Sequence, residues 1–462
     1  MVSARANLCY WAAIVEGVAL SDNDQTAQQP HAAQTIARLD KPFHFIVVLW
    51  GERFRNYFLE YCLPSLLAPG NIPVLAGHER NRFMIATRPD DWAAMRATPI
   101  FGLMERYITP VFLEIPPCPP GRSGCEHMGA GHKLALDIAY GEQAYATVLT
   151  PDCMLSDGTV ARLQDHARVG ITLVLVPALR FGEETFLGHL AARGAIKREV
   201  PAGRALALSI SGREMAFAAV NGLHSETLAY EWNAPYFVPI APAAWWRVPG
   251  EDGIVLHSLS WAFLLLDFEA LDCHDTSTLD NWTLDGDYLY KNFGRIEKIH
   301  VVQDSDEMFL ASWGPMAEIP FRPFFIFKIP LIGEWLKAGQ FRHSFYNGIF
   351  DPLKQELFYK VVRWHAQPLN QRWHEVEERA AQALSRTLRR KVSLGWMIIA
   401  IPTGLLFVAG DCWRHRAAIV RRLSQLLRGH PGARARVMWR LRILGRYIVG
   451  RQWRVPPPER MS

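Results

Sequence analysis

One acidic residue, Asp152, stands where a carboxylate can do chemistry. It follows the apolar run Tyr145–Leu149 and then Thr150 and Pro151. Because proline cannot continue a strand ladder, the strand is expected to end there and to leave Asp152 at its carboxyl end. Ligands of open α/β sheets bind at that edge, where an acid can hold a divalent cation against a diphosphate. The alternative is that Asp152 only caps a turn before the next helix.

A second acidic group lies in the segment 272–287, which contains five Asp and one His within 16 residues. Asp285 and Asp287 stand two residues apart, so both carboxylates point the same way if the segment is extended. One of them can then accept the proton of an acceptor hydroxyl as a general base. A solvated surface loop would have the same composition.

Two weaker candidates complete the set of polar groups. His257, in the run Val-Leu-His-Ser, is a candidate additional metal ligand, although a lone histidine in an apolar run is more often structural. Asp304 and Asp306 form a smaller acidic pair with the same spacing as Asp285 and Asp287.

The pattern of apolar residues indicates the elements that position these groups. The run Phe43–Trp50 is continuously apolar, which is typical of a central parallel strand buried on both faces. The sequence predicts further strands at 82–87, 111–115, 145–149, 171–176, 255–268 and 299–302, and helices at 52–67, 132–140, 158–168, 185–193 and 205–220. Because strand and helix alternate through the first half, we expect an α/β fold with a mostly parallel sheet flanked by helices.

The composition and the missing motifs exclude several classes of protein. Half of the 462 residues are apolar and 11% are aromatic, so the chain is not disordered by composition. The seven cysteines form no Cys-x-x-Cys pair, which indicates neither a zinc site nor a disulfide framework and fits a reducing compartment. No Gly-x-Gly-x-x-Gly follows the first strand and no Gly-x-x-x-x-Gly-Lys-Ser/Thr occurs, so a Rossmann dinucleotide site and a P-loop are not supported.

The last part of the chain is basic and apolar, whereas the remainder is acidic. Residues 386–462 contain 17 Lys/Arg and two acids, within a whole-chain net charge of +5. Residues 394–410 form a run of 17 uncharged residues, the lower limit for crossing ~30 Å of hydrocarbon as a helix. The apolar segment 321–335 and the basic, amphipathic segment 413–455 are typical of segments on an anionic bilayer. Because no nucleic-acid motif occurs, we expect a membrane rather than a nucleic acid as the partner.

The residues around Asp152 also resemble a known family. The helical run Gly129–Glu142, the strand that follows and Thr150-Pro151-Asp152 resemble the core of GT-A nucleotide-sugar glycosyltransferases (family-2-like), and the similarity covers residues 43–180. In that family such a strand delivers an Asp-x-Asp motif to the metal and the sugar diphosphate. Here Thr150 replaces the first Asp, and His132-Lys133 stands where many members have Arg-Asn.

The resemblance implies roles for individual positions. It places Trp50 and Gly51 against the nucleotide base, Thr87 and Asp90 at the base or ribose, Lys133 at the phosphates, and Asp152 at Mg²⁺ or Mn²⁺. His257 lies outside the resembling residues and stays a separate candidate for an additional ligand of that ion. Asp285 or Asp287 would then be the base. The alternatives stay open: Trp50 as a core aromatic, Lys133 as a solvated helix position, and Asp90-Asp91 as a helix N-cap.

From these observations we predict a glycosyltransferase that moves a sugar from a nucleotide-diphosphate donor to a hydroxyl of a lipid or envelope-polysaccharide glycan at a membrane. The alternatives are a catalytically inactive membrane-docked scaffold, which Thr150 favours, and a nucleotidyltransferase on a similar sheet. The predicted organisation is an N-terminal segment 1–40, a GT-A-like domain 41–320, an amphipathic helical region 321–390, a membrane segment 391–412 and a basic tail 413–462. We expect a membrane-associated protein with a cytoplasmic catalytic domain.

Overall fold

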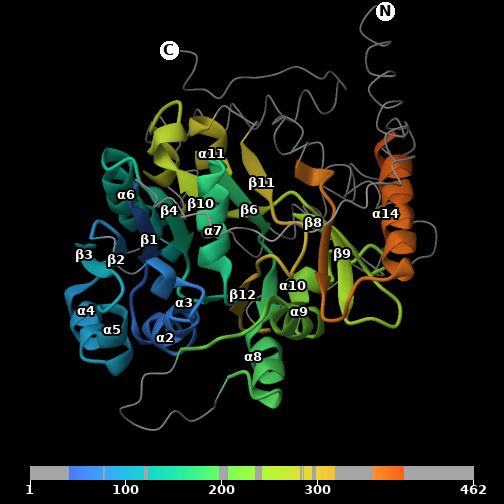
Figure 1. Ribbon diagram of the computed structural model, residues 1–462, viewed down its shortest axis with the longest axis horizontal. Coiled ribbons are helices and arrows are strands. Elements are labelled where there is room, and N and C mark those ends of the chain that lie inside the picture. Colours follow the sequence, from blue (N-terminus) through green and yellow to red (C-terminus); the bar gives the residue numbers. More distant parts are fainter. Residues whose placement is uncertain are drawn as a thin grey trace, which may run out of the picture. The chain divides into compact units, whose positions relative to one another are not determined.

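The computed structural model describes residues 41–75, 79–118, 123–196, 207–234, 242–280, 283–284, 286–293, 298–317 and 357–389. All of them lie in the unit Leu39–Ser462. This part of the chain is a mixed α/β fold whose central sheet is mainly parallel and flanked by helices (Figure 1). The predicted α/β class with a mostly parallel sheet is therefore confirmed.

The central sheet has the strand order β11-β6-β10-β4-β1-β2-β3. Its strands are β1 (Phe43–Val48), β2 (Arg82–Thr87), β3 (Thr109–Glu114), β4 (Tyr145–Leu149), β6 (Leu173–Pro177), β10 (Trp261–Asp267) and β11 (Ile299–Val301). All neighbours pair in parallel except β10, which is antiparallel to both β4 and β6. The predicted strands 82–87 and 145–149 have the predicted bounds.

Strand β1 is central because it pairs with β2 on one side and β4 on the other. All of its residues are buried, and successive side chains enter different cores: Ile46 one, Phe45 and Val47 the other. A strand covered on both faces favours apolar residues along its length, which explains the apolar run in the sequence. The buried exception, His44, is hydrogen-bonded to Glu142 at 2.9 Å.

Helices cover both faces of this sheet. Helix α6 (Gly124–Gly141) packs on the face that receives Ile46. The other face is covered by the π-helical turn η1 (Phe58–Cys62), α3 (Leu63–Leu66), α4 (Pro89–Arg96), α5 (Pro99–Met104), α7 (Thr159–Arg168) and the 3₁₀ turn η2 (Ile72–Leu75). Helix α2 (Glu52–Tyr57) precedes η1, and its buried residue Tyr57 belongs to the core that contains Ile46. Helix α6 starts eight residues before the predicted helix 132–140, because Ser123 and Glu126 form a reciprocal capping box at its N-terminus.

The apolar run 255–268 forms two strands where the sequence predicts one. Residues Gly253–Ser258 form β9 and residues 261–267 form β10, and these strands belong to different sheets. Between them the Ser258 hydroxyl accepts a hydrogen bond from the Ser260 amide at 3.1 Å and donates one to the Ser260 carbonyl at 2.6 Å. This serine turn reverses the chain without glycine or proline, so no breaker marks it in the sequence.

Two smaller sheets and several helices complete the described part. One sheet has the order β5-β12-β7 and the other β13-β9-β8. Their further strands are β5 (Cys153–Leu155), β7 (Arg180–Gly182), β8 (Ala243–Arg247), β12 (Leu310–Gly314) and β13 (Val362–His365). The remaining helices are α8 (Glu183–Ala192), α9 (Gly212–Asn221), α10 (Ser225–Leu228), η3 (Phe268–Ala270), η4 (Ser277–Asp280), α11 (Gly286–Asn292) and α14 (Gln371–Arg389).

Helix α14 lies beside β8 and β9 (Figure 1). Its side chains Trp373, Val376, Ala380 and Leu384 are buried in the same core as β9. Within the predicted helical region 321–390, the described residues therefore form a strand, β13, and a helix that share a core with the preceding domain.

The predicted membrane-associating segments 321–335, 391–412 and 413–462 lie outside the described residues, as does the N-terminal segment 1–40. In the part of the chain that the structure describes, no helix is both long enough and apolar enough to cross a bilayer.

The contact between α14 and β9 gives a test of this packing. A Cβ added to Gly253 would meet the buried Trp373 ring, at 2.5 Å from Cζ2, and the Trp364 carbonyl oxygen at 2.9 Å. Because neither neighbour can move freely, we expect Gly253→Ala to destabilise the protein by about 1–3 kcal/mol in urea unfolding. The matched control is Gly188→Ala inside α8, where a Cβ meets nothing within 4 Å. That variant should gain about 0.5–1 kcal/mol, and equal effects of the two substitutions would contradict the packing.

Candidate functional site

The carboxyl ends of β4, β1 and β2 lie side by side because the three strands pair in parallel and in this order. Asp152 follows β4, Trp50 and Gly51 follow β1, and Thr87 is the last residue of β2. The structure thus brings four of the predicted site residues to one edge of the sheet, the edge at which α/β proteins bind ligands.

Asp152 is a half-buried acid at this edge. Its carbonyl oxygen accepts a hydrogen bond from the Trp313 amide at 3.2 Å, which joins it to the small sheet containing β12. Burial raises the pKa of the Asp152 carboxyl above its ordinary value. The hydrogen bond from Thr150 and the charges of Arg180 and Arg53 act in the opposite direction and favour the carboxylate. Asp152 is therefore a half-buried acid on which the charges of two arginines act.

Arg53, Tyr57 and Glu183 form a hydrogen-bonded chain near Asp152. The Arg53 Nε donates to the Tyr57 hydroxyl at 3.0 Å, and that hydroxyl donates to Glu183 at 2.5 Å. Burial and the bond to Glu183 raise the pKa of Tyr57 to about 12, so it stays a hydrogen donor at neutral pH. The Tyr57 ring meets Trp313 edge-on, with centroids 5.9 Å apart. These contacts hold Arg53, whose charge acts on Asp152.

Arg180 reaches the site from β7, just after the carboxyl end of β6. Its guanidinium lies over Gly314 of the paired strand β12, where a Cβ would collide with it, at 2.6 Å from Cζ. Glycine at this position leaves room for the guanidinium where it lies. The charge of Arg180 acts on Asp152 and favours its carboxylate form.

The predicted donor-binding residues after β1 and β2 show different environments. Trp50 is half-buried and packs edge-on against His127 of α6, with ring centroids 5.3 Å apart. Gly51 adopts φ 85°, a conformation that favours glycine, and its amide donates to Asp91 at 2.9 Å. Thr87 is fully buried, and no hydrogen bond of its hydroxyl is found in the described part of the chain.

Asp90 and Asp91 differ although they are adjacent. Asp90 is exposed in the first turn of α4, whereas Asp91 is buried and bonded to Gly51, to Arg55 at 2.9 Å and to Arg88 at 3.3 Å. Asp91 therefore has the structural role and holds the turn after β1, which leaves Asp90 facing solvent.

The described residues of the acidic segment 272–287 contact α6 at several points. His274 bonds to Asp137 at 2.9 Å, and Lys133 pairs with Asp280 at 3.4 Å. The Leu284 amide then donates to Nδ1 of His132 at 3.3 Å.

These contacts step from the end of α6 back toward its start, where a Cβ on Gly131 would meet Val48 at 2.7 Å and Ala86 at 3.0 Å. Residues 283–284 therefore lie near the carboxyl ends of β1 and β2. Lys133, predicted to lie at the phosphates, forms an ion pair with Asp280 of the acidic segment.

Asp285, with the side chain of Asp287, lies outside the described part of the chain; the backbone of Asp287 belongs to α11. His257 lies in β9, in a different sheet from Asp152. Burial lowers the pKa of His257 to about 4, and its Nδ1 bonds to the Phe358 carbonyl at 2.9 Å. The structure does not place His257 together with Asp152 in a group of metal ligands.

Two groups of carboxylates and histidines in the described residues are close enough to hold a metal ion. The first, here the His–His–Glu cluster, consists of His166, His300 and Glu307; the second consists of Asp304, Asp306 and His365.

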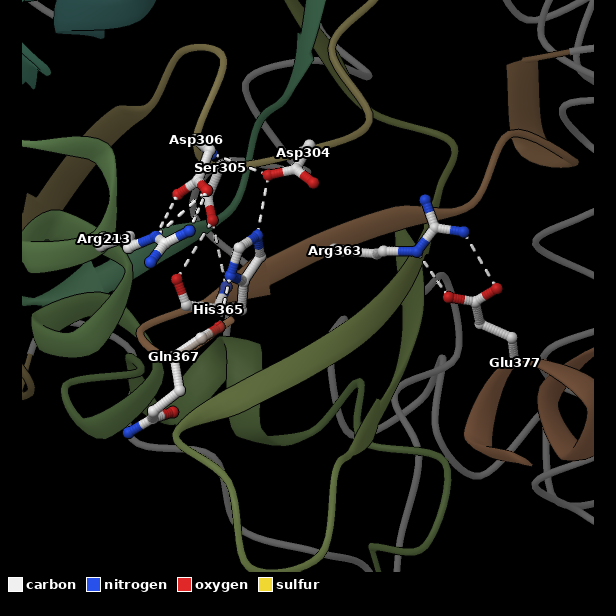
Figure 2. A network of polar contacts seen from close by, with 8 residues as sticks. All are labelled: Arg213, Asp304, Ser305, Asp306, Arg363, His365, Gln367 and Glu377. Carbon is white, nitrogen blue, oxygen red and sulfur yellow. Dashed lines mark hydrogen bonds and ion pairs between the residues drawn. The ribbon is translucent and has the colours of Figure 1, made fainter. Parts of the chain in front are cut away.

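Figure 2 shows the second group, in which Asp306 bonds to Arg213 at 2.6–3.0 Å and Asp304 bonds to His365 at 2.8 Å. Burial lowers the pKa of His365, but the bond to Asp304 outweighs it and leaves that pKa above its ordinary value. The predicted pair Asp304/Asp306 is thus engaged in ion pairs that join neighbouring segments.

Sequence reasoning missed Arg53 and Arg180. Local signals exist: Arg53 follows Gly51 by two residues and precedes Tyr57 by one helical turn, and Arg180 comes shortly after the end of a strand. Their approach to Asp152, however, depends on strand pairing between distant segments.

No protein-family model matches the chain, and no curated protein matches it. Among solved structures it is similar to one described as a glucose-1-phosphate thymidylyltransferase from Bacillus anthracis in complex with a sucrose, at 14% identity over 31% of this chain and 57% of that one, with a TM-score of 0.19. It is also similar to mouse xyloside xylosyltransferase 1 in its apo form, at 9% identity over 35% of this chain and 63% of that one, with a TM-score of 0.20. The chain spans less than two thirds of either protein. At these TM-scores neither likeness carries an argument about activity, which rests here on the sheet and its residues.

Proposed function

We propose that this protein is a glycosyltransferase that moves a sugar from a nucleotide-diphosphate donor to a hydroxyl acceptor at a membrane. The observation that supports it most is Asp152 at the carboxyl edge of a mainly parallel sheet, where the charges of Arg53 and Arg180 act on its carboxyl. An acid with two guanidinium groups in its surroundings suits a diphosphate, because arginines bind phosphate oxygens directly and the acid can hold a cation against them.

The donor would lie across the ends of β1, β2 and β4. The base would pack near Trp50 and Gly51, with Thr87 and Asp90 at the base or ribose, and the diphosphate would extend toward Asp152. Arg53 and Arg180 would bind its oxygens and stabilise the charge that develops on the leaving nucleoside diphosphate.

Asp152 fits a Mg²⁺ or Mn²⁺ ion that has only one ligand from the protein. As a single carboxylate it supplies one protein ligand, which suits an ion that takes its other ligands from phosphate oxygens and water. When bound, such an ion neutralises charge on the diphosphate. His257 has no part in this proposal, since it lies in another sheet.

We propose Asp285 or Asp287 as the base that accepts the proton of the acceptor hydroxyl. The supporting observation is the bond between Leu284 and His132, which brings the preceding residues to the carboxyl half of the sheet. Burial lowers the pKa of His132 to about 4, so this ring is a neutral acceptor and not itself a competing cation. The acceptor is proposed to be a lipid or a glycan of the envelope, reached from the cytoplasmic side.

The experiment that tests this function measures thermal stabilisation by a panel of nucleotide sugars in the presence of Mn²⁺. A donor at about 100 times its dissociation constant adds about 2.7 kcal/mol to the free energy of unfolding. One nucleotide sugar should stabilise the protein by that order, and its nucleoside diphosphate should do so in part. No stabilisation across the panel would favour the inactive scaffold.

The proposed membrane association has its own test. The apolar run 394–410 would supply burial, and the arginines of 413–455 would supply attraction to anionic lipid, worth about 1 kcal/mol per cation. Salt screens only the second contribution, since the Debye length falls from about 10 Å at 0.1 M to about 3 Å at 1 M. Full-length protein should therefore stay in the membrane fraction at 1 M salt and leave it in detergent. Release by salt alone would mean that 394–410 is not inserted.

A further inference from the structure

The His–His–Glu cluster lies apart from the proposed donor site. His166 belongs to the last turn of α7, His300 to β11, and Glu307 to the turn before β12. His300 is paired with Val174, the second residue of β6, which runs in the same direction as β4. Asp152 instead follows the last residue of β4. The cluster is therefore near the opposite edge of the sheet.

The three side chains converge on one point. The Nε2 atoms of His166 and His300 each lie 2.7 Å from the same oxygen of Glu307. The two imidazole rings stack, with centroids 4.0 Å apart and planes inclined by 28°. Side-chain exposures of 20%, 30% and 26% leave the cluster open to an ion from solvent.

We propose that His166, His300 and Glu307 bind a Zn²⁺ ion. Two imidazole nitrogens and one carboxylate oxygen, with water in a fourth position, form a donor set that suits zinc. A site with two imidazole nitrogens binds Mg²⁺ and Ca²⁺ poorly, because both ions prefer oxygen ligands.

The spacing requires only a small rearrangement. Ligand atoms bound to zinc at about 2.0–2.2 Å in a tetrahedron stand about 3.4 Å from each other. Each Nε2 therefore moves away from Glu307 by less than about 1 Å, and the three ligand atoms already lie within 4.8 Å of one another.

The second group in Figure 2 is a poorer site. The Asp306 carboxylate is already paired with Arg213. Both ring nitrogens of His365 are also hydrogen-bonded, one to Asp304 at 2.8 Å and the other to the Gln367 carbonyl at 2.7 Å. An ion would have to displace these partners. In the His–His–Glu cluster, by contrast, the bonds that an ion would replace join only the three ligands to one another.

Bound zinc would cross-link α7, β11 and the turn before β12. Strand β12 contains Trp313, whose amide bonds to the Asp152 carbonyl oxygen. The ion would therefore stabilise a strand that contacts the proposed donor site, without contacting the donor itself. The readout of zinc binding is therefore stability and metal spectroscopy rather than activity.

The test uses full-length protein stripped of metal with a chelator and then titrated with Zn²⁺ by calorimetry. We expect one Zn²⁺ per chain, a higher melting temperature, and no competition from millimolar Mg²⁺. His166→Ala and His300→Ala should each weaken binding by at least about 100-fold, since even residues behind the ligands affect affinity by 10–100-fold. The matched control is His189→Ala in α8, which should bind zinc like the natural protein.

Cobalt substitution decides the case if an alanine variant does not fold. Co²⁺ at this site should give visible absorption bands, and His300→Cys should keep Co²⁺ and add a thiolate-to-cobalt band in the near ultraviolet. Three results would overturn the proposal: absence of stoichiometric zinc, unchanged affinity in folded His166→Ala and His300→Ala, or Co²⁺ binding by His300→Cys without the thiolate band.

Discussion

Asp152→Asn is expected to lower the rate of sugar transfer by at least about 10²-fold and, at the same time, to raise the melting temperature at pH 7. The rate falls because a charge aimed at the reacting diphosphate is typically worth 10²–10³-fold. The stability rises because burial raises the pKa of this carboxyl, which shows that the folded protein disfavours its charged form. The nearly isosteric amide removes that charge and keeps the shape.

The pH dependence follows from the sign of this shift. An acid whose pKa is higher in the folded than in the unfolded state destabilises the fold increasingly as pH rises through that folded pKa. The gain in melting temperature of Asp152→Asn should therefore shrink as pH is lowered and the natural carboxyl becomes protonated. The control is Asp165→Asn on the exposed face of α7, which should change neither rate nor stability. Full activity of Asp152→Asn would remove this residue from the mechanism.

Arg180→Ala is expected to weaken donor binding by about 10–100-fold. A hydrogen bond between charged groups contributes about 1.5–3 kcal/mol, and each 1.4 kcal/mol is a factor of ten. If Arg180 binds the diphosphate in the ground state, KM for the donor should rise more than kcat falls. Arg180→Lys should recover only part of the affinity, because lysine lacks the planar fork that matches phosphate oxygens.

Arg162→Ala provides the matched control for this series. Arg162 is an exposed arginine of α7 that pairs only loosely with Asp165, at 4.0 Å. The Arg162→Ala variant removes the same charge from the protein as Arg180→Ala but should leave KM for the donor unchanged. An unchanged donor affinity in Arg180→Ala would contradict a contact between Arg180 and the diphosphate. The charge of Arg180 would then act only on Asp152.

The sheet could be predicted because its strands are marked locally. Strands β2 and β4 are apolar runs bounded by proline or glycine, and their bounds follow from composition alone. The prediction of a single strand at 255–268 was wrong for the converse reason. Ser258 and Ser260 form the turn between two strands, and serine also occurs inside strands, so it does not mark the break. Helix α6 begins before the predicted helix 132–140 because the capping box at Ser123 and Glu126 starts it at Gly124.

The candidate site was predictable only in part. Asp152 is visible in the sequence because the strand before it ends at a proline. Its two arginines are not, since Arg53 and Arg180 come from segments far apart in sequence and meet the acid only through the pairing of β1, β4 and β12. Choosing between Asp90 and Asp91 requires knowing which side of α4 faces Gly51, and the sequence does not contain that information.

The most direct test of the proposed function is the release of nucleoside diphosphate. Membranes containing the full-length protein, which also contain its acceptor, would be incubated with each nucleotide sugar of the panel, and the released nucleoside diphosphate would be measured by mass spectrometry. We predict release from one donor at a rate at least about 10²-fold above that of membranes containing Asp152→Asn. Equal release by the two proteins from every donor would contradict glycosyl transfer at this edge of the sheet.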